Sequence, residues 1–278
     1  MSFKNPLFLF IFPFYLLASL AIASPPSNPK NEPLRVLTSL AVLDFFVLEI
    51  AKDKAISTSV IPPSVEAESY EPSFSLMKQV SNARLFIGLG LPFEKAWLPR
   101  MLSSNKNLQQ LPLHERLNED SMHFWISLSM GEKIARLVTE SISQIDPSNA
   151  LFYEKNLEAL LERLSLTKQK LDALVARMPK KAFIINHPML DHFASEYGLE
   201  ELALEQHGKK YGIADLLALA KKGKALGIKR IFSAHPDKNM QTLAREIGAR
   251  VVVLSGFDSK YLENLEAFFD EISRSYED

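Results

Sequence analysis

The chain has 278 residues, of which 47% are hydrophobic and 23% charged, and its formal net charge is −1. This length and apolar content suffice for one large domain or two medium ones. The balanced charge, with no block of like charges, excludes the basic surface typical of nucleic-acid-binding proteins, so no nucleic-acid partner is expected. The 10 glycines form no phosphate-binding loop motif.

Residues 1–23 have the pattern of a cleavable signal peptide. Lys4 precedes an apolar run over residues 6–22, which ends in the small-x-small sequence Ala21-Ile22-Ala23 that signal peptidase accepts. The alternative is an uncleaved membrane anchor, which the interrupting Pro13 disfavours. The chain contains no cysteine, so it lacks the lipid-bearing cysteine of a bacterial lipoprotein. We therefore expect a soluble protein secreted to the periplasm.

Beyond residue 33, segments with strand character alternate with segments of helical periodicity. Strands are expected at residues 34–40, 56–61, 85–88, 108–111, 182–186, 199–204, 229–232 and 250–254. Helices are expected at residues 42–51, 73–80, 93–102, 127–145, 188–197, 213–226, 239–247 and 261–276. This alternation predicts an α/β fold of two lobes, each a mostly parallel sheet flanked by helices.

One long helix at residues 146–178 is predicted to link the two lobes. It has an apolar stripe in which leucines recur every seven residues, at Leu157, Leu164 and Leu171. Such a helix would be roughly 45–50 Å long, more than one compact domain normally spans. The alternative is an ordinary packing helix within a single domain. We favour an N-terminal lobe at residues 24–145, the linking helix, and a C-terminal lobe at residues 179–278.

The ends of this helix have recognisable signals. Asp146 is expected to act as the N-cap by accepting a hydrogen bond from a first-turn N–H. Pro147 suits the first helical position, where its missing N–H costs nothing. Pro179 is expected to end the helix, because proline cannot continue the hydrogen-bond pattern.

Histidines and carboxylates follow several of the predicted strands. Ligands of parallel α/β sheets bind outside the carboxyl ends of the strands, and this is where Glu68, His123, His187 and His235 fall. Imidazole and carboxylate together indicate a first-row metal, with Zn²⁺ tetrahedral on nitrogen and oxygen. The alternative for each is an ordinary loop residue, which we assign to His114 and His207. His192 lies five residues after His187, on a different helix face, so the two are not paired.

A set of motifs spans nearly the whole mature chain in a specific order. They are Pro62-Pro63, Ser69-Tyr70-Glu71-Pro72, residues 83–94, Met122-His123-Phe124-Trp125-Ile126, Asp146-Pro147 and Asn186-His187-Pro188. Together they resemble the motifs of the cluster A-I family, the zinc-uptake type of metal-binding proteins that serve ABC importers of zinc, manganese or iron.

The resemblance implies that His123 and His187 are metal ligands. Where the family usually has its first histidine, this chain has Glu68. Where many members have a glutamate before a proline in the second lobe, this chain has His235, which becomes the nearest candidate. The late aspartate motif of the family is absent, so Asp258 is a displaced alternative to His235. The predicted metal site is therefore Glu68, His123, His187 and His235.

This ligand set implies a receptor rather than an enzyme. We expect a monomer that binds Zn²⁺ with high affinity in the cleft between two lobes and delivers it to a membrane-embedded ABC permease. Four protein ligands leave no position for an activated water. Replacing an imidazole with Asp258 would favour Mn²⁺ or Fe²⁺.

Three alternatives stay open at this stage. The substitutions relative to the family could have abolished metal binding. The cleft could hold a metal chelate or another organic ligand, with Tyr70, Phe124 and Trp125 as its aromatic contacts. The protein could also be an exported zinc hydrolase, with Glu66 or Glu71 as the general base.

Overall fold

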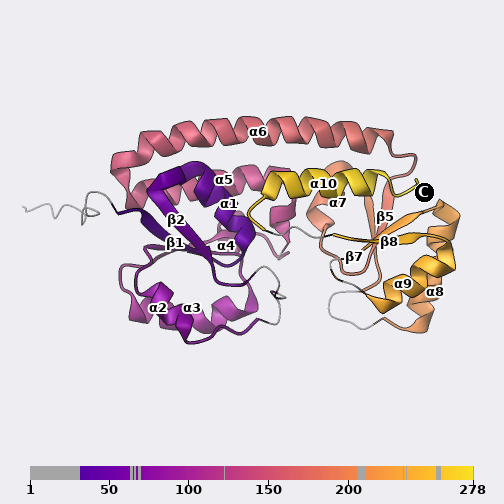
Figure 1. Ribbon diagram of the computed structural model, residues 1–278, viewed down its shortest axis with the longest axis horizontal. Coiled ribbons are helices and arrows are strands. Elements are labelled where there is room, and N and C mark those ends of the chain that lie inside the picture. The colour runs from indigo at the N-terminus through magenta and orange to yellow at the C-terminus, as the bar shows by residue number, and fades with distance from the viewer. Residues whose placement is uncertain are drawn as a thin grey trace, which may run out of the picture. The chain divides into compact units, whose positions relative to one another are not determined.

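Two four-stranded β-sheets are the framework of the protein (Figure 1). The computed structural model describes residues 32–62, 65, 67, 70–121, 123–205, 211–233, 235, 237–254 and 258–277. The predicted signal peptide at residues 1–23 lies outside them. None of the described helices is both long and apolar enough to cross a membrane.

The two sheets have the same strand order. The first consists of β1 (Leu34–Thr38), β2 (Ala55–Ser59), β3 (Leu85–Gly88) and β4 (Gln109–Pro112), in the order β2-β1-β3-β4. The second consists of β5 (Ala182–Ile185), β6 (Glu200–Ala203), β7 (Arg230–Ser233) and β8 (Arg250–Val253), in the order β6-β5-β7-β8. All neighbouring strands are parallel. This confirms the predicted α/β class and places the switch points of the two sheets beside β1 and β5.

Helices cover the first sheet on both faces. The set comprises α1 (Ala41–Ala51), α2 (Ser75–Val80), α3 (Pro92–Ser104), α4 (Leu113–Leu117) and α5 (Leu128–Ile145). Helix α1 contacts β1, β2 and α5, while α2 and α3 contact each other below the sheet in Figure 1. Two short 3₁₀ helices, η1 (Lys52–Lys54) and η2 (Phe124–Ile126), complete this lobe. His114, which was expected in a loop, lies in α4.

The second lobe contains α7 (Asp191–Tyr197), α8 (Ile213–Leu226), α9 (Lys238–Ile247) and α10 (Tyr261–Ser273). Glycine residues in the left-handed conformation end α7 and α8, at Gly198 (φ 61°) and Gly227 (φ 74°). Helix α9 contacts β7, β8 and α8, whereas α10 contacts the long helix α6.

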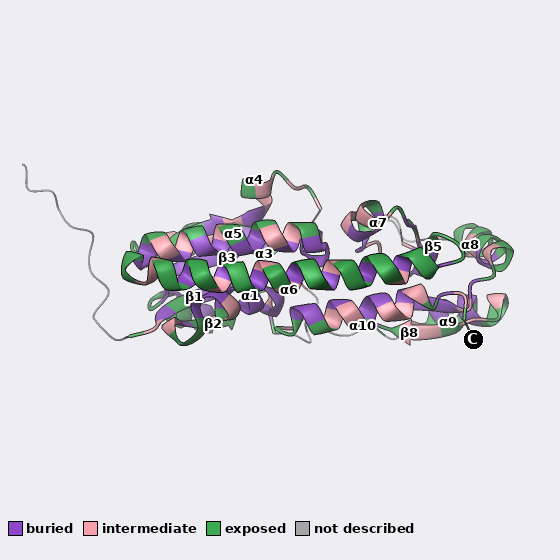
Figure 2. Cartoon of the chain, turned by 90° about the horizontal axis from the view of Figure 1, so that it is seen from above, coloured by how far each residue is buried: buried purple, intermediate pink, exposed green. Residues whose placement is uncertain are grey.

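Helix α6 (Ala150–Arg177) has 28 residues and crosses both lobes (Figure 1). At about 1.5 Å per residue it is roughly 42 Å long. Its contacts are with α1 and α5 of the first lobe and α10 of the second, and Figure 2 shows α5 and α10 flanking it. The leucines predicted to form the stripe, Leu157, Leu164 and Leu171, are buried, and so are Tyr153, Leu160, Thr167 and Val175. The helix stops at Arg177, two residues before Pro179.

The start of α6 differs from the prediction. Residues Pro147–Asn149 form a 3₁₀ turn, η3, and the α-helix begins only at Ala150. Asp146 does not cap a backbone N–H. Its carboxylate accepts hydrogen bonds from the side chains of Ser148 (2.7 Å), Asn149 (2.7 Å) and the buried Tyr153 (2.6 Å). The Tyr153 hydroxyl needs an acceptor in the interior, and Asp146 supplies it.

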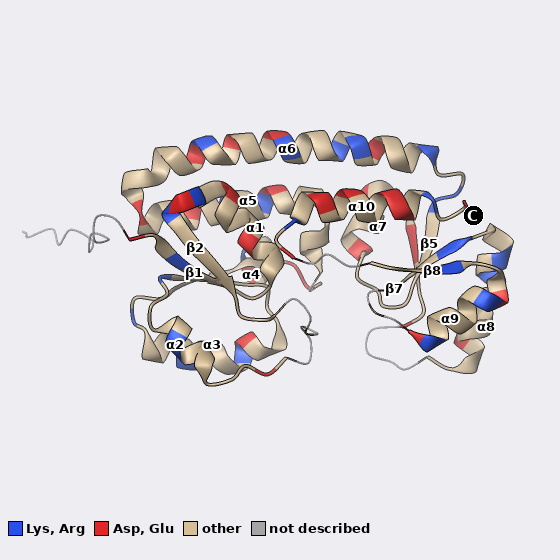
Figure 3. Ribbon diagram, in the orientation of Figure 1, with Lys and Arg blue, Asp and Glu red and all other residues tan. Residues whose placement is uncertain are grey.

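The contact between α6 and α10 combines a buried apolar strip with opposite charges. Figure 3 shows basic and acidic residues interspersed along α6, whereas the visible side of α10 carries mainly acidic ones. Glu266 of α10 accepts hydrogen bonds from Thr167 Oγ1 (3.1 Å) and Lys170 Nζ (2.8 Å) of α6. The polar Thr167 within the apolar stripe is thereby satisfied.

Tyr261 lies in a hydrophobic core cluster that includes residues of both lobes. It is the first residue of α10, is fully buried, and packs its ring against Phe45 (5.3 Å between centroids) and Phe46 (5.0 Å) of α1. Its hydroxyl donates to the carbonyl oxygens of Trp125 (2.8 Å) and Ser127 (3.2 Å). The hydroxyl also lies 2.7 Å from where a β-carbon on Gly131 would be.

We predict that Gly131→Ala destabilises the protein by about 1–3 kcal/mol, because the new methyl group meets a hydroxyl held on both sides. Helix propensity alone predicts that alanine raises the free energy of unfolding by about 1 kcal/mol. A decrease would therefore identify the steric contact with Tyr261. Urea unfolding measures the change. If Tyr261→Phe did not offset part of the loss in the double variant, the explanation would be wrong.

Candidate metal centre

Two histidines from different lobes face each other. The ring centroids of His123 and His187 are 5.5 Å apart, and the rings are nearly perpendicular at 83°. His123 immediately precedes η2 in the first lobe, and His187 is the second residue after β5 in the second lobe. Two imidazoles at this separation can approach one metal ion with a small side-chain adjustment.

The sheet explains the position of His187. Beyond the end of β5, the Asn186 N–H donates to the Phe232 carbonyl of β7 at 3.0 Å. The strand pairing therefore continues one residue further, and His187 leaves the sheet at its switch point. Ligand sites of open α/β sheets occur at this place.

A buried aromatic segment holds His123. The three residues after it, Phe124, Trp125 and Ile126, are all buried, and the Ile126 N–H donates to the His123 carbonyl at 3.0 Å. On the other side the His123 N–H donates to Ser121 Oγ at 3.2 Å. Phe124 and Trp125, which were considered as aromatic contacts for an organic ligand, are thus core residues.

The surroundings of His123 keep its imidazole neutral. Burial, together with the neighbouring His187, lowers its pKa to about 4, although Asp191 acts in the opposite direction. A neutral imidazole has a lone pair available for a metal, whereas a protonated one does not. At neutral pH His123 is therefore in the form that binds metal.

Among the described residues, no contact joins His235, the third predicted ligand, to this pair. Glu68 lies outside the described residues. His235 is exposed, and its described contact is through its backbone carbonyl, which accepts from Ser233 Oγ at 2.5 Å. Across the described part of the chain, no group of three or more His, Cys, Asp or Glu residues is arranged to hold a metal. Of the four predicted ligands, the structure brings together His123 and His187.

Asp258, the alternative to His235, has a structural role at the start of α10. Its Oδ1 accepts hydrogen bonds from the Lys260 N–H (2.9 Å) and Asn264 Nδ2 (2.7 Å). The carboxylate therefore organises the turn that leads into the helix.

Polar contacts connect the segment before α5 with α7, beside the histidine pair. His192 Nε2 lies 3.1 Å from Glu119 Oε2, and both side chains are largely buried. Two further carboxylates of α7 accept hydrogen bonds from serines of the first lobe: Asp191 from Ser121 (3.3 Å) and Glu196 from Ser127 (2.6 Å). The ring of His192 thus has a partner of its own, consistent with leaving it out of the metal site.

Sequence reasoning missed these carboxylates and also Glu205, whose Oε2 lies 3.0 Å from His187 Nδ1. Glu205 could have been found, because it follows a predicted strand as His187 does. Glu119 and Glu196 carry no such signal, since their partners belong to the other lobe.

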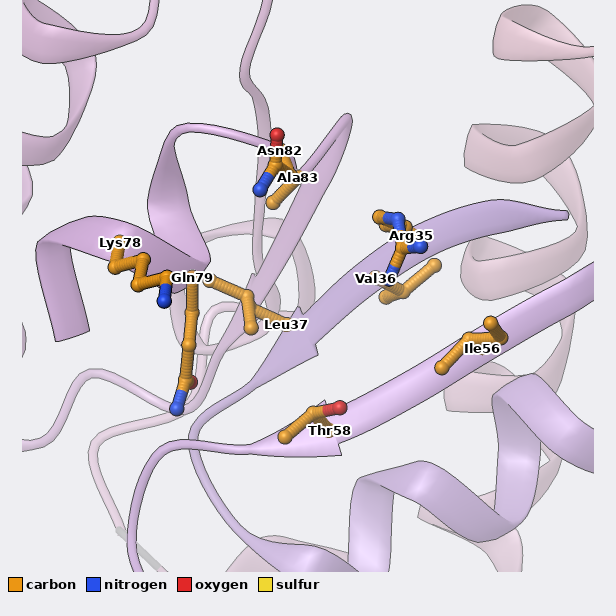
Figure 4. A pocket seen from close by; sticks show the side chains of 9 residues that line it. All are labelled: Arg35, Val36, Leu37, Ile56, Thr58, Lys78, Gln79, Asn82 and Ala83. Carbon is orange, nitrogen blue, oxygen red and sulfur yellow. The ribbon is translucent and has the colours of Figure 1, made fainter. Parts of the chain in front are cut away.

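Two cavities lie elsewhere in the first lobe. One of about 240 Å³ lies between β1, β2 and α2, and Figure 4 shows Arg35 and Lys78 among its lining residues. Two cations make it unsuitable for a metal ion. The other, of about 500 Å³, lies between α3 and β4. Glu94 in its wall accepts from the N–H groups of Leu89 and Gly90, both at 3.0 Å. Its carboxylate is therefore engaged in shaping the loop after β3.

Comparison with known proteins gives consistent matches over most of the chain. The family model described as zinc-uptake complex component A, periplasmic, matches residues 36–275. The high-affinity zinc uptake system protein ZnuA of Bacillus subtilis is 26% identical over 259 residues, covering 82% of this chain and 80% of that protein. The manganese ABC transporter substrate-binding lipoprotein PsaA of Streptococcus pneumoniae is 24% identical over 244 residues, covering 79% and 78%.

Solved structures match the fold as well. A crystal structure of ZnuA superimposes with a TM-score of 0.82 at 24% identity, covering 88% of this chain and all of the other (100%). A Mn-bound mutant of the periplasmic metal-binding protein from candidatus liberibacter asiaticus gives 0.76 at 21% identity, covering 87% and 99%. Proteins whose names specify zinc and manganese are thus both similar to this chain.

We predict that Glu119→Ala lowers the free energy of unfolding by about 1–2 kcal/mol, because it leaves the largely buried His192 ring without its carboxylate. Glu140→Ala is the matched control: its pair with Arg116 is exposed, with side-chain exposures of 50% and 45%, and its loss should cost under about 0.5 kcal/mol. Urea unfolding measures the free energy of unfolding of both variants. Equal decreases would contradict a stabilising role of the Glu119–His192 contact.

We also predict that the metal-free protein becomes less stable as the pH falls from 7 to 5. An unfolded histidine titrates near 6.5 and folded His123 near 4, so between these values the unfolded chain binds one more proton. The loss specific to His123 should be on the order of 2 kcal/mol. This loss of stability should disappear in His123→Gln. It should persist in His235→Gln, because His235 is exposed. A pH dependence unchanged in His123→Gln would refute the neutral, buried state.

Proposed function

Because the chain belongs to the zinc-uptake complex component A family, we propose that it binds Zn²⁺ in the periplasm and delivers it to an ABC import permease. Membership confirms the resemblance inferred from the motifs. Like its named relatives, the protein is a metal-binding receptor of an uptake system. It is not an enzyme. The observation that carries the proposal for this chain's own site is the His123–His187 pair, 5.5 Å apart across the two lobes.

The choice of Zn²⁺ rests on the chemistry of the donors. Imidazole nitrogen suits zinc, whereas manganese prefers carboxylate, carbonyl and water oxygens. We propose that Glu68 and His235 complete the set, giving three imidazoles and one carboxylate around the ion. Mn²⁺ is the competing cargo, because the relative named for a manganese transporter is 24% identical to this chain, close to the 26% of the zinc uptake protein.

Binding and release follow from the way the lobes are joined. The shared core of α6, α10 and Tyr261 resists a wide hinge opening, so closure around the ion requires only a small tilt. The ion neutralises part of the negative charge of Glu68 and is held by imidazoles from both lobes. Tilting the lobes apart by a small angle separates His123 from His187 and weakens the site for transfer.

We further propose that residues 1–23 are removed on export and that the mature chain begins at Ser24. In this proposal residues 24–145 form the N-terminal lobe, residues 146–178 the linking region and residues 179–278 the C-terminal lobe. The chain has no cysteine for lipid attachment, so we propose a soluble periplasmic monomer, unlike the relatives named lipoproteins.

We predict that the mature protein binds one Zn²⁺ tightly and that His123→Ala and His187→Ala each weaken binding by at least about 100-fold. Losing a ligand should cost more than losing an outer-shell partner, which costs 10–100-fold. Isothermal titration calorimetry with Zn²⁺, and with Mn²⁺ in parallel, measures the affinities. His114→Ala is the matched control, because this histidine belongs to the same lobe as His123 but lies in α4.

Each outcome of this experiment is informative. Preference for Mn²⁺ would keep the receptor role and change the cargo. Binding of one metal ion that neither histidine variant affects would place the site elsewhere. A mature protein that binds neither metal after removal of bound ions and reconstitution would refute the proposed function.

A further inference from the structure

The backbone holds Glu205 beside His187. Strands β5 and β6 are paired in register up to Ile185 and Ala203. The ladder continues past this point: the Leu204 N–H donates to the Ile185 carbonyl (2.9 Å) and the Glu205 N–H to the Asn186 carbonyl (2.8 Å). Glu205 and His187 therefore leave adjacent strands at the same level, so their proximity is set by the register.

The side chains of these two residues form a directed contact. His187 Nδ1 lies 3.0 Å from Glu205 Oε2, and both side chains are about two-thirds buried, with 30% and 38% exposure. An ionised carboxylate only accepts hydrogen bonds, so Nδ1 carries the proton. The ring nitrogen that can bind a metal is then Nε2.

The contact also has an electronic effect on the imidazole. A carboxylate that accepts from the far ring nitrogen makes the other nitrogen a stronger donor to a metal and fixes the plane of the ring. His123 has no such partner among the described residues: its hydrogen bonds there are through its backbone, and Asp191 acts on it only as a nearby charge. The two imidazoles of the pair are therefore prepared for a metal in different ways, one by burial and one by Glu205.

We propose that Glu205 is a positioning residue for the cargo site, which holds His187 in the Nδ1–H tautomer and aims Nε2 at the metal shared with His123. Glu205 does not itself bind the ion in this proposal. The proposal rests on the proposed function, since it assumes that His187 is a ligand. It names a determinant of affinity that lies outside the four predicted ligands.

Two measurements test the proposal. In calorimetry with Zn²⁺, Glu205→Ala should weaken binding 10–100-fold, as expected for an outer-shell carboxylate. Glu205→Gln keeps a carbonyl oxygen at the same place and should recover part of the loss. Glu200→Ala is the matched control on the same strand, because its carboxylate pairs with Lys222 (2.6 Å) instead of a histidine. It should bind zinc like the unmodified protein.

The second measurement needs no metal. In ¹⁵N-labelled, metal-free protein, the NMR signals of the His187 ring should show the proton on Nδ1, and in Glu205→Ala the proton should move largely to Nε2. A merely structural role of Glu205 would not move this proton. An Nε2–H tautomer in the unmodified protein, or zinc affinity unchanged in Glu205→Ala, would overturn the proposal. Failure of the proposed function would instead appear as absent zinc binding in the unmodified protein, with the tautomer result unaffected.

Discussion

The packing of Tyr261 between the two lobes is the constraint on which the rest of the structure depends. Its ring fills the space against Phe45 and Phe46, and its hydroxyl satisfies the carbonyls of Trp125 and Ser127. These carbonyls belong to the segment that follows His123. The first residue of α10 thus anchors the segment that holds one histidine, while α10 itself packs on α6. Because this core includes residues of both lobes, a wide separation of the two histidines would disturb close-packed side chains, whereas a small tilt would not.

A layer of polar contacts between the lobes lies beside the histidine pair. Helix α7 presents Asp191, His192 and Glu196 to partners in the first lobe, at Ser121, Glu119 and Ser127. Apolar packing is non-directional, whereas these hydrogen bonds specify one alignment of the surfaces. The core therefore keeps the lobes together and the polar layer defines how they meet, and both act on the same short segment around His123.

Two different environments set the state of the two histidines in the pair. Burial keeps His123 uncharged, with a pKa of about 4. His187 instead lies against Glu205, whose carboxylate defines which nitrogen carries the proton. A receptor for a metal cargo has to bind the ion tightly and still release it. The proposed donors from separate lobes would meet both needs, since a small relative tilt would separate His123 from His187 without unfolding either sheet.

The sequence by itself determined the order of the strands and helices, the parallel sheets and the long apolar stripe of α6, because these follow from local periodicity and turn residues. Their positions after predicted strands, together with the family resemblance of the motifs, predicted that His123 and His187 belong to one site. The tertiary structure decided the rest. Asp146 accepts from the buried Tyr153 and does not cap a backbone N–H, since an interior hydroxyl needs a partner. The contact of Glu119 with His192 depends on how the lobes pack and leaves no trace in local residue patterns. Glu205 follows a predicted strand, but its pairing with His187 depends on the strand register.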